Sequence, residues 1–134
     1  MREKNQLLNV IRILEKYQVG ATDSVVPTNQ YFPLHQFLKN HFRKNRKMGS
    51  TDRKLTSRLL YNYFRLGKIL KNLSVEERIA IGSFICENEN LPLLEFILTN
   101  YSRLKKEDLP KGLDEKIKIV QEHHPEFDLN DLFP

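Results

Sequence analysis

Hydrophobic residues recur along this chain at intervals of three and four positions, which is the spacing of one face of an α-helix. The first segment shows this spacing at Leu7, Val10, Ile11, Leu14 and Tyr17. It predicts a helix over residues 5–18 that ends near Gly20. No stretch alternates between apolar and polar residues for long, and β-branched residues do not cluster. We therefore expect an all-α domain, a bundle of five to seven helices.

Proline and capping residues predict where the next helices begin. Pro33 can open a second helix, because its missing N–H leaves no hydrogen bond unmade in the first turn. Ser50 or Thr51 is expected to cap a third helix. That helix should run to about Gly67, with a continuation to Leu70 left open.

Three further helices are predicted in the second half. Ser74 and Glu77 form a capping box, because a Ser cap is followed three residues later by Glu. The helix after it should turn five residues inward: Ile79, Ala80, Ile81, Phe84 and Ile85. Pro92 starts a fifth helix, and a sixth is expected around residues 114–123.

Positive charge is concentrated in the middle of the chain. The whole sequence has a net charge of +5, yet residues 39–71 carry eleven Lys and Arg with Asp52 as their only acidic residue. Residues 72–134 carry seven basic and thirteen acidic residues. A local excess of this kind indicates what a protein binds rather than how it folds. The basic segment therefore predicts a polyanionic partner.

Composition points to an intracellular protein. The single cysteine, Cys86, excludes an internal disulfide and a cysteine-rich zinc site. The chain begins with an amphipathic pattern, and no apolar run approaches the roughly 20 residues that cross a bilayer. We expect a cytoplasmic protein without a membrane partner.

A helical projection of residues 52–70 separates an apolar face from a basic stripe. The residues expected to face the core are Leu55, Leu59, Tyr63, Leu66 and Leu70. Long cationic side chains one turn apart can follow a phosphate backbone, and a tyrosine can stack on an unpaired base. With the basic run just before the helix, the candidate RNA-binding residues are Arg43, Lys44, Arg46, Lys47, Lys54, Arg58, Tyr61, Arg65 and Lys68.

Charge alone leaves two alternatives open. The stripe can be a solvated face whose cations pair with acidic residues from the C-terminal half. The partner can also be DNA or an acidic protein surface instead of RNA, since each presents negative charge.

No catalytic or metal site is predicted. Adjacent histidines on a helix, such as His123 and His124, point about 100° apart and do not share a metal. His35 and His41 have no metal-like partner at helical spacing. Cys86 has no basic neighbour in the sequence to lower its pKa, so a structural thiol is expected. The chain has no glycine-rich phosphate loop and no nucleophile elbow.

Two short segments carry a family resemblance. Gly49-Ser50-Thr51-Asp52-Arg53 followed by Tyr61-Asn62-Tyr63-Phe64-Arg65 resembles the D-R…Y-x-x-x-R motif of the NusB-like N-terminal domain in Sun-type rRNA cytosine-C5 methyltransferases. Residues 33–39 and the basic run are similar to one bacterial branch of that family. The resemblance covers residues 5 to about 90, and the rest only weakly.

The resemblance implies a NusB-like helical bundle that binds RNA. It also implies two partners: rRNA, and a C-terminal catalytic domain that uses S-adenosylmethionine. This chain has no cofactor-binding glycine loop and no Pro-Cys or Thr-Cys nucleophile motif. We therefore expect residues 1–134 to be one non-catalytic domain without its own cofactor, with residues 125–134 leading into the missing methyltransferase domain. A protein-interaction domain and a stand-alone antitermination-like factor are the alternatives.

Asp52 and Arg53 are predicted to be structural, although the family motif includes both. Arg53 lies near the far edge of the apolar face, away from the stripe. An arginine in the first turn of a helix is unfavourable beside the helix dipole, so an ion pair with an acidic residue of the C-terminal half, or a helix-terminal carbonyl, is expected. Asp52 is expected to cap the helix or to pair.

Overall fold

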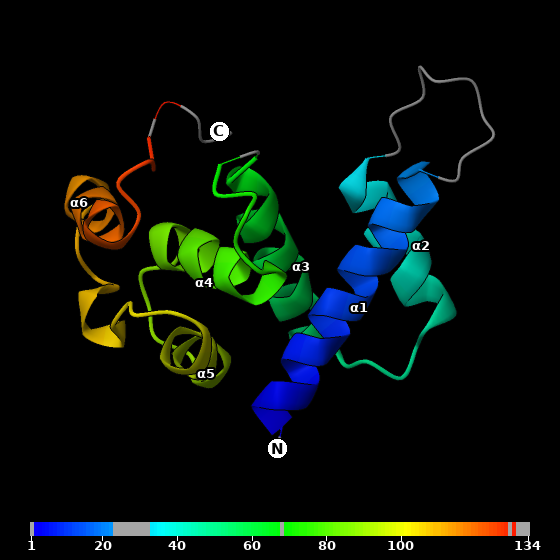
Figure 1. The fold of residues 1–134 in the computed structure, drawn as a ribbon. Coiled ribbons are helices and arrows are strands. Elements are labelled where there is room, and N and C mark those ends of the chain that lie inside the picture. The colour runs from blue at the N-terminus through cyan, green and yellow to red at the C-terminus, as the bar shows by residue number, and fades with distance from the viewer. Residues whose placement is uncertain (1, 23–32, 68, 129, 131–134) are drawn as a thin grey trace.

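The computed structural model describes residues 2–22, 33–67, 69–128 and 130, and this part of the chain consists of helices joined by loops, without strands (Figure 1). Its elements are α1 (Arg2–Thr22), α2 (Leu34–Lys44), α3 (Ser50–Arg65), α4 (Val75–Cys86), α5 (Pro92–Tyr101), the short 3₁₀ turn η1 (Lys106–Asp108) and α6 (Leu113–His123). The all-α prediction is confirmed. None of the helices, as far as they are described, is long and apolar enough to span a bilayer.

The central helix is α4, which packs against α3, α5 and α6, while α1 packs across α3 and α5 (Figure 1). Every residue from Arg78 to Ile85 is buried. A helix enclosed on several sides has no polar face to show to water, which explains its continuous apolar run. In contrast, α2 buries only Leu34 and Leu38, and it lies at the outer edge of the bundle.

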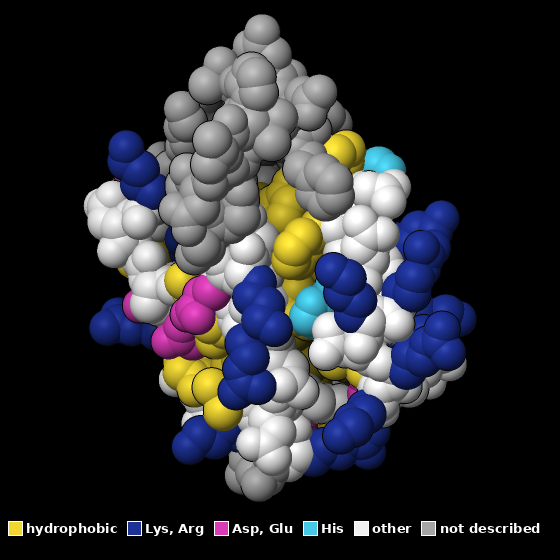
Figure 2. All heavy atoms as spheres, turned by 90° about the vertical axis from the view of Figure 1, so that its right-hand side faces the viewer, with side chains coloured by type: hydrophobic (Ala, Val, Ile, Leu, Met, Phe, Trp, Pro, Cys, Tyr) yellow, Lys and Arg dark blue, Asp and Glu magenta, His cyan; other side chains and the backbone are white. Residues whose placement is uncertain are grey.

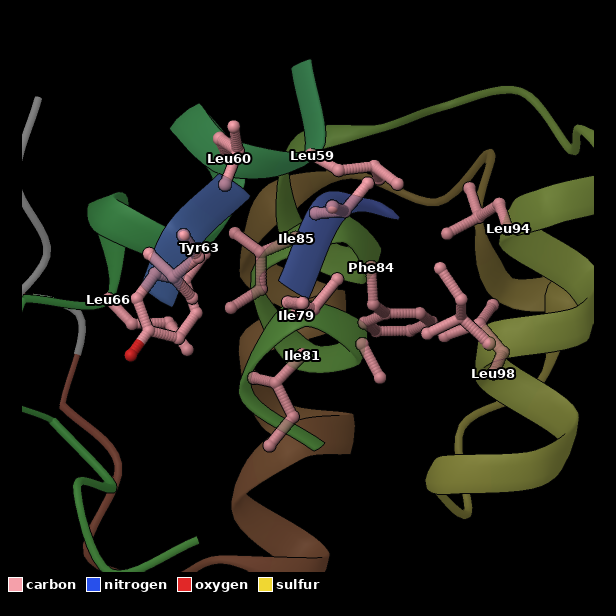
Figure 3. Close-up of a cluster of buried hydrophobic side chains, with 14 of the residues drawn as sticks. Leu59, Leu60, Tyr63, Leu66, Ile79, Ile81, Phe84, Ile85, Leu94 and Leu98 are labelled. Atoms are coloured by element: carbon pink, nitrogen blue, oxygen red, sulfur yellow. The ribbon is translucent and has the colours of Figure 1, made fainter. Parts of the chain in front are cut away.

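One part of the core lies where α3, α4 and α5 meet (Figure 3), and buried residues of α1, α2 and α6 belong to the same core. The five residues predicted to point inward from α4 are all buried. The apolar face predicted for α3 is also confirmed, because Leu59 and Tyr63 are buried and Leu55 is partly buried against the core. In Figure 3, Phe84 of α4 points toward Leu98 of α5. These contacts hold α3, whose other side carries the basic residues.

The two central helices approach each other closely at Gly82. A Cβ atom built on Gly82 would lie 2.3 Å from the carbonyl oxygen of Asn62 on α3. The buried Asn62 side chain donates hydrogen bonds to Ser83 Oγ at 3.3 Å and to Glu87 Oε2 at 2.9 Å. A glycine is required at this contact, because any side chain would force the helices apart.

The C-terminal ends of α1 and α3 differ from the sequence predictions. The first helix continues through Gly20 to Thr22, so the predicted stop is wrong; a glycine inside a helix costs only about 1 kcal/mol. The third ends at Arg65 and does not continue to Leu70. Gly67 and Leu70 have φ angles of 58° and 55°, which turn the chain away from the helix.

Capping was predicted correctly for α4 but not for α3. The backbone N–H of Glu77 donates to Ser74 Oγ at 3.1 Å, which confirms the capping box residues. The N-cap of α3 is Gly49, and no side chain caps that end. Ser50 is the first helical residue, so the predicted cap at Ser50 or Thr51 is wrong.

A buried arginine holds the connection between α3 and α4. Arg78 donates through Nη2 to the carbonyl oxygens of Gly67 at 2.5 Å and Ile69 at 3.3 Å. Its guanidinium lies 4.6 Å from the centre of the Tyr63 ring. The loop after α3 is therefore anchored to the next helix.

The segment after α6 folds back onto the domain. Phe127 is buried in the core, and its carbonyl oxygen accepts a hydrogen bond of 2.9 Å from Gln121 Nε2. The first residues of the predicted lead-in, residues 125–134, thus belong to the packed domain. Residues 129 and 131–134 lie outside the described part.

Candidate nucleic-acid interface

A groove of about 990 Å³ lies between α2, with the turn that follows it, and the first three turns of α3. From α2 and its turn come Lys39, Phe42, Arg43 and Arg46. From α3 come Ser50, Arg53, Lys54, Ser57, Arg58 and Tyr61. The groove is open, and its two walls come from different helices.

The lining of this groove is basic and aromatic. It contains six cationic side chains and no acidic one. Tyr61 is 42% exposed, which is unusual for a large aromatic residue, and Phe42 is half-buried. A charged face that is merely solvated would not be expected to carry exposed aromatic rings. The presence of both cations and exposed rings favours a ligand that carries negative charge and flat apolar surfaces.

Each wall forms because its residues recur at helical spacing. Lys39, Phe42 and Arg43 are three and four positions apart, so they lie on one face of α2. The residues of α3 follow the same spacing from Ser50 to Tyr61. Leu34 and Leu38 are buried and hold α2 on the core, and Phe42, one turn after Leu38, packs partly against the core as well.

The structure brings five of the nine candidate RNA-binding residues together in the groove. These are Arg43, Arg46, Lys54, Arg58 and Tyr61. Of the remainder, Lys47 lines a different pocket on the other side of α2. Lys44 is exposed and lines neither cavity, and Lys68 lies outside the described residues.

Arg65 lies beyond the groove. It is exposed, and its Nη1 donates to the sulfur of Cys86 at 3.6 Å. The expectation that Cys86 lacks a basic neighbour is therefore wrong, because the packing of α4 on α3 brings Arg65 beside it. Burial raises the pKa of the Cys86 thiol, and the smaller effect of Arg65 opposes that rise. A raised pKa lowers the fraction of thiolate at neutral pH, and the thiolate is the reactive form.

Sequence reasoning missed Lys39, Phe42, Ser50, Arg53 and Ser57 as lining residues. The spacing of Lys39, Arg43 and Arg46 could have indicated a basic face on the second helix. The position of Arg53 was predicted wrongly: it lines the same groove as Lys54. No ion pair or side-chain hydrogen bond of Arg53 occurs in the described part of the chain. A groove between two helices covers a wider arc of α3 than the single stripe of a helical projection.

One groove cation is paired with the acidic half of the protein. Arg58 Nη2 forms an ion pair with Glu87 Oε1, although Arg58 is 54% exposed and Glu87 only 12%. The other carboxylate oxygen of Glu87 accepts from Asn62. The buried Lys116 donates to the Glu87 carbonyl at 2.6 Å. For Arg58, the alternative of pairing with the C-terminal half is thus correct.

Asp52 has a structural contact. Gln6 Nε2 of α1 donates to Asp52 Oδ1 at 3.2 Å, which ties the start of α3 to the first helix. A carboxylate in the first turn also suits the positive end of the helix dipole. Its place agrees with the pairing role expected for it.

Comparison with known proteins adds no relative. No family model, curated protein or solved structure matches the chain. Within the described residues, no group of three or more His, Cys, Asp or Glu side chains could hold a metal ion. What the groove binds is therefore inferred from its own side chains.

Proposed function

We propose that this domain binds RNA in the groove between α2 and α3. The observation that carries the proposal is the lining itself: six cations from α2, the turn after it and α3, with no acidic residue among them. Arg58 is the groove cation with an ion-pair partner among the described residues. The other five therefore keep their charge available for a ligand.

A single-stranded or looped RNA suits this lining best. Cations on both walls can neutralise successive phosphates of one strand, which releases counterions and favours binding. Tyr61 is exposed at one end of the basic row and can stack on an unpaired base. A regular duplex keeps its bases paired and stacked inside, so it offers no unpaired base on which Tyr61 could stack.

The motif around Asp52 and Tyr61 connects the groove to a biological role. Its resemblance to the N-terminal domain of Sun-type methyltransferases supports rRNA as the ligand. In that role the domain recognises rRNA and delivers it to an S-adenosylmethionine-dependent catalytic domain. The domain itself contributes binding and orientation, not the methyl transfer.

The test replaces three groove cations at once: Lys39→Glu, Arg53→Glu and Lys54→Glu. Binding of a fluorescently labelled single-stranded RNA is followed by anisotropy at several salt concentrations. We expect affinity to fall at least ten-fold. The plot of log affinity against log salt has a negative slope, and its steepness should fall by roughly 2. Each of the three lost phosphate contacts contributes about 0.7 for a single strand.

A matched control makes the same change in net charge away from the groove. Arg103, Lys105 and Lys118 are exposed in the C-terminal half, and their triple replacement by Glu should leave affinity within about two-fold. Equal losses in both variants would mean that only net charge matters, and the groove would not be the site. If the wild-type domain binds no RNA even at low salt, the proposal fails, and DNA and an acidic protein surface are the partners to test.

A further inference from the structure

A second pocket, of about 370 Å³, lies on the other side of α2, between α1 and the turn that leads into α3. Polar residues line its walls from three sides: Gln6, Asn9, Arg12 and Lys16 from α1, His41, Asn45 and Lys47 from α2 and the turn, and Asp52 and Thr56 from α3. Pockets that hold small ligands have volumes of roughly 300–1,000 Å³. This one is large enough for a small molecule.

The mouth of this pocket is positively charged. Arg12, Lys16 and Lys47 are exposed, and none of them has an ion-pair partner among the described residues. The one acidic lining residue, Asp52, is already engaged by Gln6. Figure 2 shows this face, where Lys and Arg side chains gather around a histidine and a partly exposed hydrophobic strip.

The floor of the pocket is apolar with polar groups beside it. Ile13, Leu55 and Leu93 line it, and Ile13 and Leu93 are buried. Met48 also lines it, with its sulfur within 3.9 Å of the Thr56 hydroxyl. Burial and the positive charge of Lys16 lower the pKa of His41, which favours the neutral ring, the form that can accept a hydrogen bond. An apolar surface next to amide and imidazole groups fits a heterocyclic base.

We infer that the pocket between α1 and α2 binds a nucleotide, with the phosphate on Arg12, Lys16 and Lys47 and the base against the apolar floor. The nucleotide can be one unit of an RNA strand or a free mononucleotide. Consecutive residues of one turn favour the strand: Arg46 lines the α2–α3 groove and Lys47 lines this pocket. A strand in the groove therefore reaches the pocket by crossing that turn. If the nucleotide is part of a strand, the inference rests on the proposed RNA-binding function.

The pocket contains a convenient probe, because the chain has only two methionines. Protein labelled with ¹³C at the methionine methyl groups is titrated with the four ribonucleoside monophosphates. Met48→Leu assigns the Met48 signal. We expect at least one monophosphate to shift this signal saturably, and the double variant Lys16→Glu/Lys47→Glu to weaken that response at least ten-fold. The groove variant Arg53→Glu/Lys54→Glu should retain it.

Two reference ligands test the chemistry. Inorganic phosphate and the unphosphorylated nucleosides should each bind at least ten-fold more weakly than the best monophosphate. Equal binding of phosphate alone would mean an anion site without base recognition, and the nucleotide inference would fail. Circular dichroism checks that the double variant keeps its helical content, which the exposure of both lysines predicts.

Titration with a single-stranded RNA separates the two sources of the nucleotide. If RNA shifts Met48 and the pocket variant binds RNA at least five-fold more weakly, the strand occupies the pocket. If monophosphates shift Met48 but the pocket variant keeps its RNA affinity, the ligand is a free mononucleotide. No shift of Met48 with any ligand at millimolar concentration overturns the inference, while groove-dependent RNA binding would leave the proposed function intact. A saturable monophosphate response without RNA binding would support the nucleotide pocket and overturn the proposed RNA-binding function.

Discussion

Arg58 on α3 forms an ion pair with Glu87, the residue that follows α4. The pair joins the rim of the basic groove to the acidic half of the protein. Glu87 is itself fixed, because its carboxylate accepts from Asn62 and its carbonyl accepts from Lys116. A cation that lines the binding groove is thereby held in one orientation by a well-anchored carboxylate.

Glu87→Gln should therefore strengthen RNA binding while weakening the fold slightly. The change removes a negative charge beside the groove and releases Arg58. We expect a two- to five-fold gain in affinity, which corresponds to about 0.5–1 kcal/mol. Stability should fall by less than about 1 kcal/mol, since Arg58 is half exposed to water.

Anisotropy and urea denaturation measure both effects. Glu89→Gln is the matched control, because Glu89 is exposed and has no ion pair among the described residues. RNA affinity that is the same in Glu87→Gln and the wild type would show that Arg58 takes no part in binding.

Gly82→Ala should be strongly destabilising. The new methyl group would lie 2.3 Å from the carbonyl oxygen of Asn62, so α3 and α4 must separate and their core contacts weaken. We expect a loss of roughly 1–3 kcal/mol or more in the free energy of unfolding. Urea denaturation measures it. Gly112→Ala is the control, as nothing lies within 4 Å of its added Cβ; a loss there as large as in Gly82→Ala would contradict the crowding argument.

Arg78→Met should open the connection between α3 and α4. It removes the hydrogen bonds to the carbonyls of Gly67 and Ile69 but keeps much of the apolar length of the side chain. We expect the protein to lose roughly 1.5–3 kcal/mol, as is usual for hydrogen bonds from a charged group. Denaturation gives the total, and hydrogen exchange should become faster at residues 69–73. Unchanged exchange there would mean that the loop does not depend on Arg78.

The reactivity of Cys86 should depend on pH and on Arg65. Burial raises the pKa of the thiol, while the Arg65 guanidinium favours the thiolate. Only the thiolate is alkylated, so the rate of alkylation by iodoacetamide rises with pH. The midpoint of that rise should lie above the usual pKa range of a thiol, and Arg65→Met should move the midpoint further upward. The midpoint is obtained by measuring the alkylation rate of the wild type and of Arg65→Met over a series of pH values. A midpoint that moves downward would show that Arg65 does not stabilise the thiolate.

Local structure was largely determined by the sequence. Hydrophobic spacing located the helices, and the Ser74–Glu77 box marked the start of α4 correctly. These features depend on residues within one or two turns of each other, so they can be recognised without the fold. The ends of α1 and α3 were less accurate, because α1 continues through Gly20 to Thr22 and α3 ends at Arg65.

The site was determined only in part by the sequence. Helical periodicity placed Lys54, Arg58 and Tyr61 on one side of α3, and that arrangement is correct. The basic run before α3 also supplied Arg43 and Arg46 of the facing wall, whereas Lys39, Phe42 and the inclusion of Arg53 required the tertiary structure. So did the pairing of Arg58 with Glu87, which lies 29 positions away. Periodicity decides which side chains share a face of one helix, whereas the packing of distant helices decides which faces meet.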